Sequence, residues 1–204
     1  MSNTLSAHKL TLVRGERCLF KGLNFALGSG ELLLLEGRNG SGKTSLLKAI
    51  IGLLELETGE FQWNGMPVRS QRQEFLSASV WMAHRVGMKP DLTASENLSF
   101  ESTLRPLNNC DIEEALERLG VLRLKKLPLR SLSAGQQRRV GLARMLIARA
   151  TLWLMDEPFT NLDREGRDLL TGIISDHIEA GGLCVLAAHQ DVAVDVPTQR
   201  ILLE

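Results

Sequence analysis

The sequence predicts an α/β fold in which a mostly parallel sheet carries antiparallel edge strands and a small helical lobe. Strand-like and helix-like segments alternate in the second half of the chain, with a strand expected over 152–155, a helix over 164–180 and a strand over 183–188. This alternation implies parallel strands that helices cover on both faces. The run Leu32–Leu35 is apolar at every position, which is typical of a central strand buried on both faces.

Two antiparallel, half-exposed strands are predicted near the N-terminus. Apolar residues alternate on either side of the turn signal Gly15-Glu16, at Leu10 and Leu12 and then at Leu23, Phe25 and Leu27. Alternation of this kind marks a strand with one buried face. A short strand over 61–63 followed by Asn64-Gly65 is typical of a hairpin.

Helical spacing of apolar residues predicts a first helix over 43–51, with Gly52 as its C-cap. Another buried strand is expected over 80–83. The helix over 164–180 is expected to stop at Gly181-Gly182.

A helical lobe is predicted at about 90–148, inserted into the core of the fold. From Thr93 to about Leu127 the sequence becomes helical in character. A second helix of the lobe is expected over 134–148, with Ser133 as its N-cap.

The length and net charge of the chain limit the classes of protein to which it can belong. We expect a single domain over the 204 residues 1–204. The chain carries 24 Lys and Arg against 24 Asp and Glu, and this balance offers no electrostatic attraction for nucleic acid. No apolar run approaches the ~20 residues that cross a bilayer, and residues 1–16 lack the apolar core of a signal peptide. We therefore expect no nucleic-acid partner and no direct membrane insertion.

The three cysteines, Cys18, Cys110 and Cys184, are odd in number and far apart. Their spacing fits neither a zinc site nor a disulfide framework. This pattern predicts a protein of a reducing cytosol.

A phosphate-binding loop is predicted between the buried strand over 32–35 and the helix over 43–51, because Gly37 to Thr44 fits G-x-x-x-x-G-K-[ST]. Its glycines allow successive N–H groups to turn towards phosphate oxygens at the positive end of a helix. Lys43 is expected to bridge the β- and γ-phosphates, and the Thr44 hydroxyl to ligate Mg²⁺. The residues expected to bind ATP here are Gly37, Arg38, Asn39, Gly40, Ser41, Gly42, Lys43, Thr44 and Ser45.

Two adjacent acids, Asp156 and Glu157, follow the predicted strand over 152–155. Carboxylates are costly to bury unpaired, so we expect both at the open carboxyl end of this strand. In a phosphate-loop protein this position places Asp156 beside the metal and makes Glu157 the candidate general base. The pair favours hydrolysis over binding alone, and a solvated acidic turn is the alternative.

A second candidate anion site lies at the start of the helix over 134–148. Ser133 supplies a hydroxyl and Gly135 allows close approach to exposed amides. The helix is rich in arginine, at Arg138, Arg139 and Arg144. The alternative is an ordinary serine N-cap on an amphipathic helix.

These segments resemble the ATP-binding-cassette (ABC) family. Leu132–Gln136, about twenty residues ahead of the acid pair, resembles the signature motif, and Asn161–Asp163 resembles the D-loop. His189 resembles the switch histidine that contacts the γ-phosphate. The resemblance extends from Leu5 to His189 and implies an ATPase that uses ATP and Mg²⁺.

The resemblance also implies a head-to-tail homodimer. In such a dimer Ser133, Gly135 and Gln136 of one cassette close over the nucleotide that Lys43 of the other cassette holds. Asp163 is assigned to the nucleotide site on the same resemblance. ATP binding would close the dimer and hydrolysis would release it.

Two positions depart from the family pattern. The aromatic residue that stacks on adenine falls at Arg14, and the Q-loop glutamine falls at His84. A guanidinium can stack on a base, so we expect Arg14 to take this place, and a solvated arginine beside a turn is the alternative. We expect His84 to act in catalysis through a water, with a sensitivity to pH.

A short cassette with Arg14, His84 and the segment Leu92–Leu98 resembles the ATPase subunits of the bacterial cytochrome c maturation system, the haem exporter. This resemblance implies an integral-membrane (CcmB-like) permease subunit, haem-handling membrane proteins, and a peripheral position on the cytoplasmic face of the inner membrane. ATP would then be used to move or release haem.

Other functions remain open. The first two are an ABC exporter with another cargo and a soluble ABC ATPase without a membrane partner. The third is a P-loop kinase, and both the signature motif and Glu157 argue against it. We expect no haem site on this chain, because His8 and His177 have the polar neighbours of surface residues.

Overall fold

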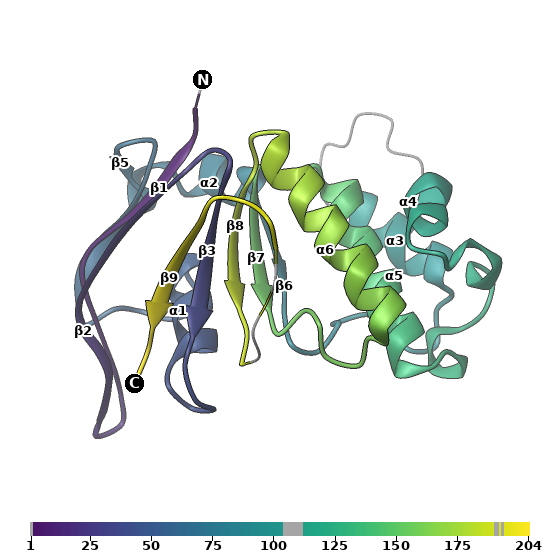
Figure 1. Cartoon of the computed structure of the whole chain (residues 1–204), viewed down its shortest axis with the longest axis horizontal. Coiled ribbons are helices and arrows are strands. Elements are labelled where there is room, and N and C mark those ends of the chain that lie inside the picture. The colour runs from purple at the N-terminus through teal and green to yellow at the C-terminus, as the bar shows by residue number, and fades with distance from the viewer. Residues whose placement is uncertain (1, 104–111, 190–191, 193) are drawn as a thin grey trace.

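The chain forms three layers, with an antiparallel sheet on one side, a parallel sheet in the middle and helices on the other side (Figure 1). This computed structural model describes residues 2–103, 112–189, 192 and 194–204. Cys110 and the segment 104–111 of the predicted lobe lie outside this part. Of the other two cysteines, Cys18 is exposed and Cys184 is buried.

The strands of the antiparallel sheet are, in spatial order, β2 (Arg17–Gly28), β1 (Thr4–Arg14), β4 (Thr58–Trp63) and β5 (Met66–Pro67). The two predicted N-terminal strands are confirmed, since β1 and β2 pair antiparallel with Leu5 opposite Leu27. The predicted hairpin is also confirmed. Asn64 and Gly65 have φ angles of 52° and 79°, the left-handed pair that a two-residue hairpin turn needs.

The strands of the parallel sheet are, in spatial order, β6 (Ser79–Met82), β7 (Leu152–Asp156), β8 (Leu183–Ala187), β3 (Glu31–Glu36) and β9 (Thr198–Leu202). All neighbouring pairs in it are parallel. The α/β fold class is confirmed, with one difference: the antiparallel strands form a sheet of their own and are not edges of the parallel sheet.

The helices are α1 (Lys43–Ile50), α2 (Arg72–Ala78), α3 (Ala94–Thr103), α4 (Ile112–Arg118), α5 (Ala134–Ala148) and α6 (Arg164–Glu179), with 3-10 turns at Val68–Gln71, Leu122–Leu124 and Leu129–Ser131. The helix α5 has the predicted bounds. α1 and α6 each end one residue earlier than predicted, and Gly52 follows the C-cap Ile51 with a φ of 78°. In the lobe, α4 ends before Gly120, whose φ of 67° is the left-handed conformation that terminates helices.

One α-helix, α2, and one strand of the parallel sheet, β9, were not predicted. α2 has seven residues and buries only Phe75, so it shows no apolar stripe. β9 alternates between exposed and half-buried residues and pairs only with β3 within the described part of the chain. An edge strand of this kind has a weak hydrophobic pattern.

The four leucines of β3 divide between two cores, which explains why the run Leu32–Leu35 is apolar at every position. Leu32 and Leu34 belong to a core that includes residues of α5 and α6. Leu33 and Leu35 belong to a second core, which α1 and the antiparallel sheet complete. All four side chains are at most 1% exposed. The antiparallel sheet therefore covers α1, and this helix begins at the predicted phosphate loop.

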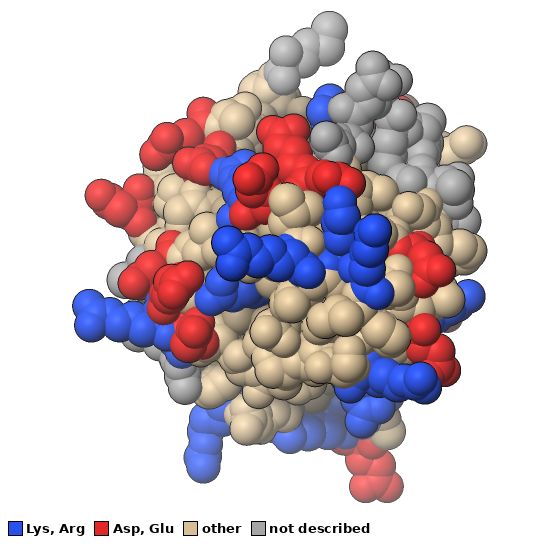
Figure 2. Space-filling view, turned by 90° about the vertical axis from the view of Figure 1, so that its right-hand side faces the viewer, with Lys and Arg blue, Asp and Glu red and all other residues tan. Residues whose placement is uncertain are grey.

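The surface in Figure 2 is the helical side of the molecule. Basic and acidic side chains are interspersed there around an area of other residues, and neither sign covers this face. Mixed charge of this kind produces no strong field of one sign. Among the helices of the described residues, none combines the length and the apolar character that a membrane crossing requires.

Candidate active site

A pocket of about 470 Å³ lies at the carboxyl ends of the parallel strands. The phosphate loop follows β3, His84 follows β6, Glu157 follows β7 and His189 follows β8. Because these strands run parallel, their carboxyl ends meet at one edge of the sheet. The pocket is lined by Arg14, Leu19, Asn39, Gly40, Gly42, Lys43, Thr44, Ser45, His84, Glu157, Thr160 and His189.

The predicted phosphate loop requires glycine at two positions. At Gly37, with φ 140°, an added Cβ atom would lie 2.2 Å from the main-chain oxygen of Leu203. Gly42, with φ 109°, is the N-cap of α1 and has no side chain to accept from the first turn of the helix. The first N–H groups of α1 are thus left for another acceptor, and an anion suits this position.

The ammonium group of Lys43 lies within the loop and is well placed for a phosphate. Lys43 is 6% exposed, and its Nζ donates to the carbonyl oxygens of Gly37 and Arg38 at 2.6 and 3.2 Å. The Ser41 hydroxyl is buried and has no hydrogen-bond partner among the described residues. A buried cation and an unpartnered hydroxyl in one loop indicate a site for an oxyanion.

Thr44 and Asp156, the two candidate metal ligands, lie in contact with each other. The Thr44 hydroxyl lies 3.0 and 2.9 Å from the two carboxylate oxygens of Asp156, a residue that is 2% exposed. Burial raises the pKa of Asp156, and the hydrogen bond from Thr44 opposes that rise. A hydroxyl and a carboxylate are hard ligands that suit Mg²⁺, which usually takes its remaining ligands from phosphates and water. Within the described residues, no three His, Cys, Asp or Glu side chains are arranged so that they could hold a metal ion by themselves.

Glu157 has a backbone conformation that is uncommon for a residue with a side chain. Its φ angle is 50°, in the left-handed region. Its main-chain N–H donates to the carbonyl of Ala187 on β8 at 2.9 Å. Its carboxylate Oε2 lies 2.6 Å from Nδ1 of His189. The turn after β7 thus directs the candidate general base towards the candidate switch histidine.

Arg14 and His84, the two departures from the family pattern, also line this pocket. Arg14 ends β1 and approaches the phosphate loop from the antiparallel sheet. His84 lies two residues beyond the end of β6. Their positions suit a contact with the base and a contact near the phosphates, and both roles stay predictions.

The signature residues do not line the pocket of their own chain. Ser133 and Gln136 form a reciprocal cap of α5, in which the Ser133 hydroxyl accepts from the Gln136 N–H and the Gln136 side chain accepts from the Ser133 N–H. Gly135 lies against the D-loop, where an added Cβ atom would be 2.9 Å from the Asn161 oxygen. The carboxylate of Asp163 caps α6, accepting from the Gly166 N–H at 2.8 Å.

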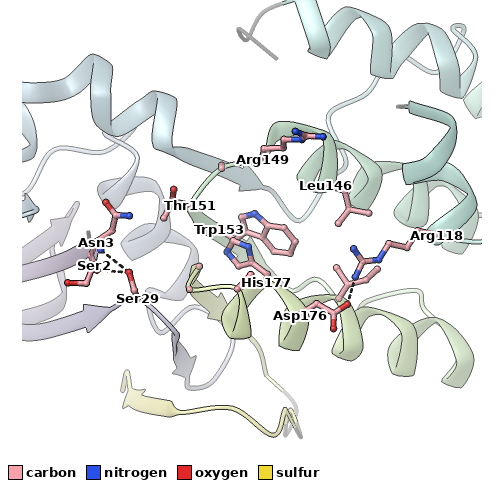
Figure 3. Close-up of a pocket in the computed structure, with 15 residues that line it drawn as sticks. Ser2, Asn3, Ser29, Arg118, Leu146, Arg149, Thr151, Trp153, Asp176 and His177 are labelled. Atoms are coloured by element: carbon pink, nitrogen blue, oxygen red, sulfur yellow. Dashed lines mark hydrogen bonds and ion pairs between the residues drawn. The ribbon is translucent and has the colours of Figure 1, made fainter. Parts of the chain in front are cut away.

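A larger pocket, of about 590 Å³, lies at the opposite ends of the parallel strands (Figure 3). The ring of His177 stacks on Trp153 there, with centroids 3.9 Å apart, and burial lowers the pKa of His177. His177 is half-buried and not fully exposed, because the indole covers one face of its ring. This pocket has no phosphate loop and no acid pair, so we assign the chemistry to the smaller pocket.

Three residues with direct bearing on the site were not predicted. Leu19 and Thr160 line the pocket, and Arg138 lies behind it and donates to the main-chain oxygen of Glu157. Leu19 belongs to β2, and the residue pattern of this strand gives no evidence of ligand binding. Thr160 lies only three residues after Glu157. This short distance in the sequence is the feature from which its place in the pocket could have been predicted.

A glycine-dependent phosphate loop between a strand and a helix, with an Asp-Glu pair at the end of another strand of the same parallel sheet, defines a P-loop nucleotide-binding protein. The chain belongs to the ABC transporter family, whose model matches residues 20–160. ATP-binding proteins of this family are ATPases, so the chain is a nucleotide-binding enzyme of this class.

The chain is similar over nearly its whole length to curated proteins named cytochrome c biogenesis ATP-binding export protein CcmA. It is 44% identical to that of Dechloromonas aromatica (strain RCB), covering 97% of this chain and 98% of the relative. It is 43% identical to that of Escherichia coli (strain K12), covering 93% of this chain and 91% of the relative.

Solved structures show the same fold. An ABC transporter ATP-binding protein from Pyrococcus furiosus matches with a TM-score of 0.84 at 24% identity, over 97% of this chain and 96% of the other. A bacterial Atm1-family ABC exporter with ATP bound matches with a TM-score of 0.85 at 16% identity, over 98% of this chain and 37% of the other.

Proposed function

We propose that this chain is the ATP-hydrolysing subunit of a membrane export complex that serves cytochrome c biogenesis. The observation that carries the proposal is the 42% to 44% identity to cytochrome c biogenesis ATP-binding export proteins across more than nine-tenths of the chain. The pocket supports it, since it joins a phosphate loop to a carboxylate placed for general-base chemistry.

In the proposed mechanism the phosphate loop binds the triphosphate. The free N–H groups at the start of α1 and the ammonium group of Lys43 bind the β- and γ-phosphate oxygens. Thr44 and Asp156 would hold Mg²⁺, which when bound neutralises charge on the phosphates. The 2.9 and 3.0 Å contacts between these two side chains support that assignment.

Glu157 is proposed as the general base. Its carboxylate accepts a proton from a water as the water oxygen bonds to the γ-phosphorus. The bond between that phosphorus and the oxygen bridging to the β-phosphate breaks, and ADP and phosphate result. His189, 2.6 Å from the carboxylate, orients Glu157 and is placed to reach the γ-phosphate. His84, in the pocket wall, is proposed to hold a water of the site, and Arg14 to stack on the base.

Two copies of the chain are proposed to form the complete site. Ser133, Gly135 and Gln136 lie outside the pocket of their own chain, yet they form a helix N-terminus suited to an anion. In a head-to-tail homodimer they would close over the nucleotide of the partner subunit, with Asp163 at the same interface. ABC ATP-binding subunits act as dimers with membrane permease partners, which supports this arrangement.

The similarity to the cytochrome c biogenesis relatives supports a proposal for the partners and the location. We propose a single-domain cassette that lies on the cytoplasmic face of the bacterial inner membrane and associates with an integral-membrane permease and haem-handling proteins. Haem is the proposed cargo. An ABC exporter with another cargo is the second candidate, because the phosphate site contains nothing that selects a cargo.

Deletion of the gene in its native bacterium tests this function. The proposal predicts loss of covalently bound haem from c-type cytochromes, restored by the wild-type gene and not by a Glu157→Gln gene. It also predicts that the tagged chain co-purifies from detergent-solubilised membranes with a permease. Normal c-type cytochromes in the deletion strain would assign the chain to another cargo, and recovery without any membrane protein would favour a soluble ATPase.

A further inference from the structure

Arg138 is a buried cation on α5 whose guanidinium faces main-chain oxygens. It is 2% exposed. Its Nε donates to Pro158, its Nη1 to Ala83 and His84, and its Nη2 to Asp156 and Glu157, at distances of 3.1, 3.2, 2.9, 3.1 and 2.5 Å in that order. A guanidinium has five N–H donors. The five carbonyl oxygens match that number.

These carbonyls belong to two loops that are far apart in the sequence. Ala83 and His84 follow β6, and the segment 156–158 ends β7 and turns away from it. Burial lowers the pKa of Arg138 to about 10, while the nearby carboxylates of Asp156 and Glu157 act against this shift. The group therefore stays charged at neutral pH and attracts the carbonyl dipoles of both loops.

The turn at Glu157 needs an external support. A left-handed backbone conformation is unfavourable for a residue with a side chain and persists only where its surroundings hold it. The carbonyl of Glu157 accepts from Arg138 at 2.5 Å, and its N–H donates to Ala187 at 2.9 Å. The hydrogen bond from Arg138 thus fixes the main-chain carbonyl of Glu157, the residue whose side chain is the candidate base.

The same helix connects these loops to the signature motif. α5 begins with the cap at Ser133, five residues before Arg138. The neighbouring Arg139 pairs with Asp163 of the D-loop at 3.1 Å, and Arg144 donates to the Trp81 carbonyl of β6 at 2.5 Å. A rotation of α5 would therefore move the two loops that Arg138 holds.

We propose that Arg138 is a positioning residue for ATP hydrolysis, which by holding the main chains of His84 and Glu157 together couples both to the helix that begins at Ser133. This inference rests on the proposed role of Glu157 as general base. It identifies the arginine-rich start of α5 as the connection between the signature motif and the catalytic turn. Arg138 acts through Glu157 and contacts no substrate.

Lysine cannot replace this group, although it keeps the charge. An ammonium has three donors around a single nitrogen and lacks the planar fork that reaches two loops at once. Arg138→Lys therefore keeps a buried cation and removes the bridge. Glutamine at the same position also loses the charge.

The test compares ATP affinity with turnover in folded protein. Arg138→Lys is expected to leave the Kd for ATP within about 2-fold of wild type and to lower kcat by about 10- to 100-fold, because small misplacements of a catalytic group have effects of this size. The matched control is Arg130→Lys, since Arg130 forms an exposed ion pair with Asp91 outside the site. Hydrogen exchange should rise in both loops, around residues 83–85 and 156–160, and not in β1 or β2.

A double substitution separates a positioning role from a structural one. In a Glu157→Gln background, Arg138→Lys should change the remaining turnover by less than about 2-fold, because groups that act as a unit are not additive. An equal loss in both backgrounds, or an unchanged kcat in the single variant, would overturn the proposal.

Whether the variants fold is also a result that tests the proposal. If Arg138→Lys and Arg138→Gln both fail to fold while Arg130→Lys folds, Arg138 is a residue of structural stability and the proposal is wrong. A wild-type protein without ATPase activity, or a fully active Glu157→Gln variant, would contradict the proposed function. An active wild-type protein with an unimpaired Arg138→Lys variant would contradict the positioning role alone.

Discussion

The carboxylate of Glu157 lies 2.6 Å from Nδ1 of His189, although 32 residues separate them in the chain. The pairing follows from the sheet, because β7 and β8 are parallel neighbours and each residue lies just beyond the end of its strand. This geometry places the proposed general base and its histidine partner beside the phosphate loop.

Glu157→Gln should abolish most turnover and leave ATP binding intact. An amide keeps the shape of the side chain and cannot take a proton from water, so kcat is expected to fall by about 10²- to 10⁴-fold. Equilibrium binding of ATP and steady-state ATPase assays measure the two effects separately. Wild-type turnover in this variant would remove Glu157 as the base.

Thr44→Val should raise the Mg²⁺ concentration needed for half-maximal ATPase activity by about 10-fold or more. Valine matches threonine in shape and lacks the hydroxyl that lies 2.9 and 3.0 Å from the Asp156 oxygens. Thr44→Ser keeps that hydroxyl and serves as the control. Equal Mg²⁺ dependence in the two variants would exclude Thr44 as a metal ligand.

The secondary structure was largely predictable where the signal for an element lies within a short segment of the sequence. The helix predicted over 134–148 with Ser133 as its N-cap is α5, which has these bounds and this cap. β9 was missed because its pairing with β3 joins residues about 166 positions apart, as Thr198 opposite Leu32 shows, and its own pattern is weak. The antiparallel strands were wrongly predicted to be edges of the parallel sheet. The apolar pattern of a strand identifies the strand and its hairpin partner, but it does not show whether two groups of strands form one sheet or two.

The pocket was predictable to the extent that its residues follow strands. Lys43, His84 and Glu157 each follow a predicted strand, and parallel strands end at one edge. The role of Arg138 was not predictable, because its acceptors are main-chain oxygens, and any residue type supplies those. Only the three-dimensional approach of two loops reveals them.

Arg14→Ala should weaken ATP binding if the guanidinium stacks on the base. A cation over an aromatic face at an open site contributes about 0.5–1 kcal/mol, so the Kd should rise by about 2- to 5-fold. Arg14→Tyr should restore the affinity, and Lys21→Ala, at an exposed position on β2, should leave it unchanged. An unaltered Kd in Arg14→Ala would identify Arg14 as a solvated side chain.

Stability should fall as the pH drops below the ordinary pKa of histidine, in part because of His177. Burial lowers the pKa of His177 in the folded protein. The unfolded chain then takes up its proton first, near pH ~6.5. The contribution is complete above that pH and is lost as the pH falls towards the folded pKa, with a slope of at most about 1.4 kcal/mol per pH unit.

His177→Phe isolates this contribution, because phenylalanine keeps a ring against Trp153 and does not titrate. The free energy of unfolding, measured in urea at pH 7.5 and at pH 5.5, should depend less on pH in the variant. The other histidines are common to both proteins, so the difference between the two slopes belongs to His177. Identical slopes would contradict the burial effect.

Two chains together are proposed to form each nucleotide site, and the ATPase activity of a mixed dimer tests this arrangement. Lys43→Ala removes the phosphate cation, and Gly135→Asp places a carboxylate at the signature motif, so each homodimer should have two defective sites and little activity. A heterodimer of the two variants, purified through two different tags, has one site with both changes and one with neither if the sites form between chains. This heterodimer should then retain about half of wild-type turnover. A heterodimer as inactive as its parents would contradict it.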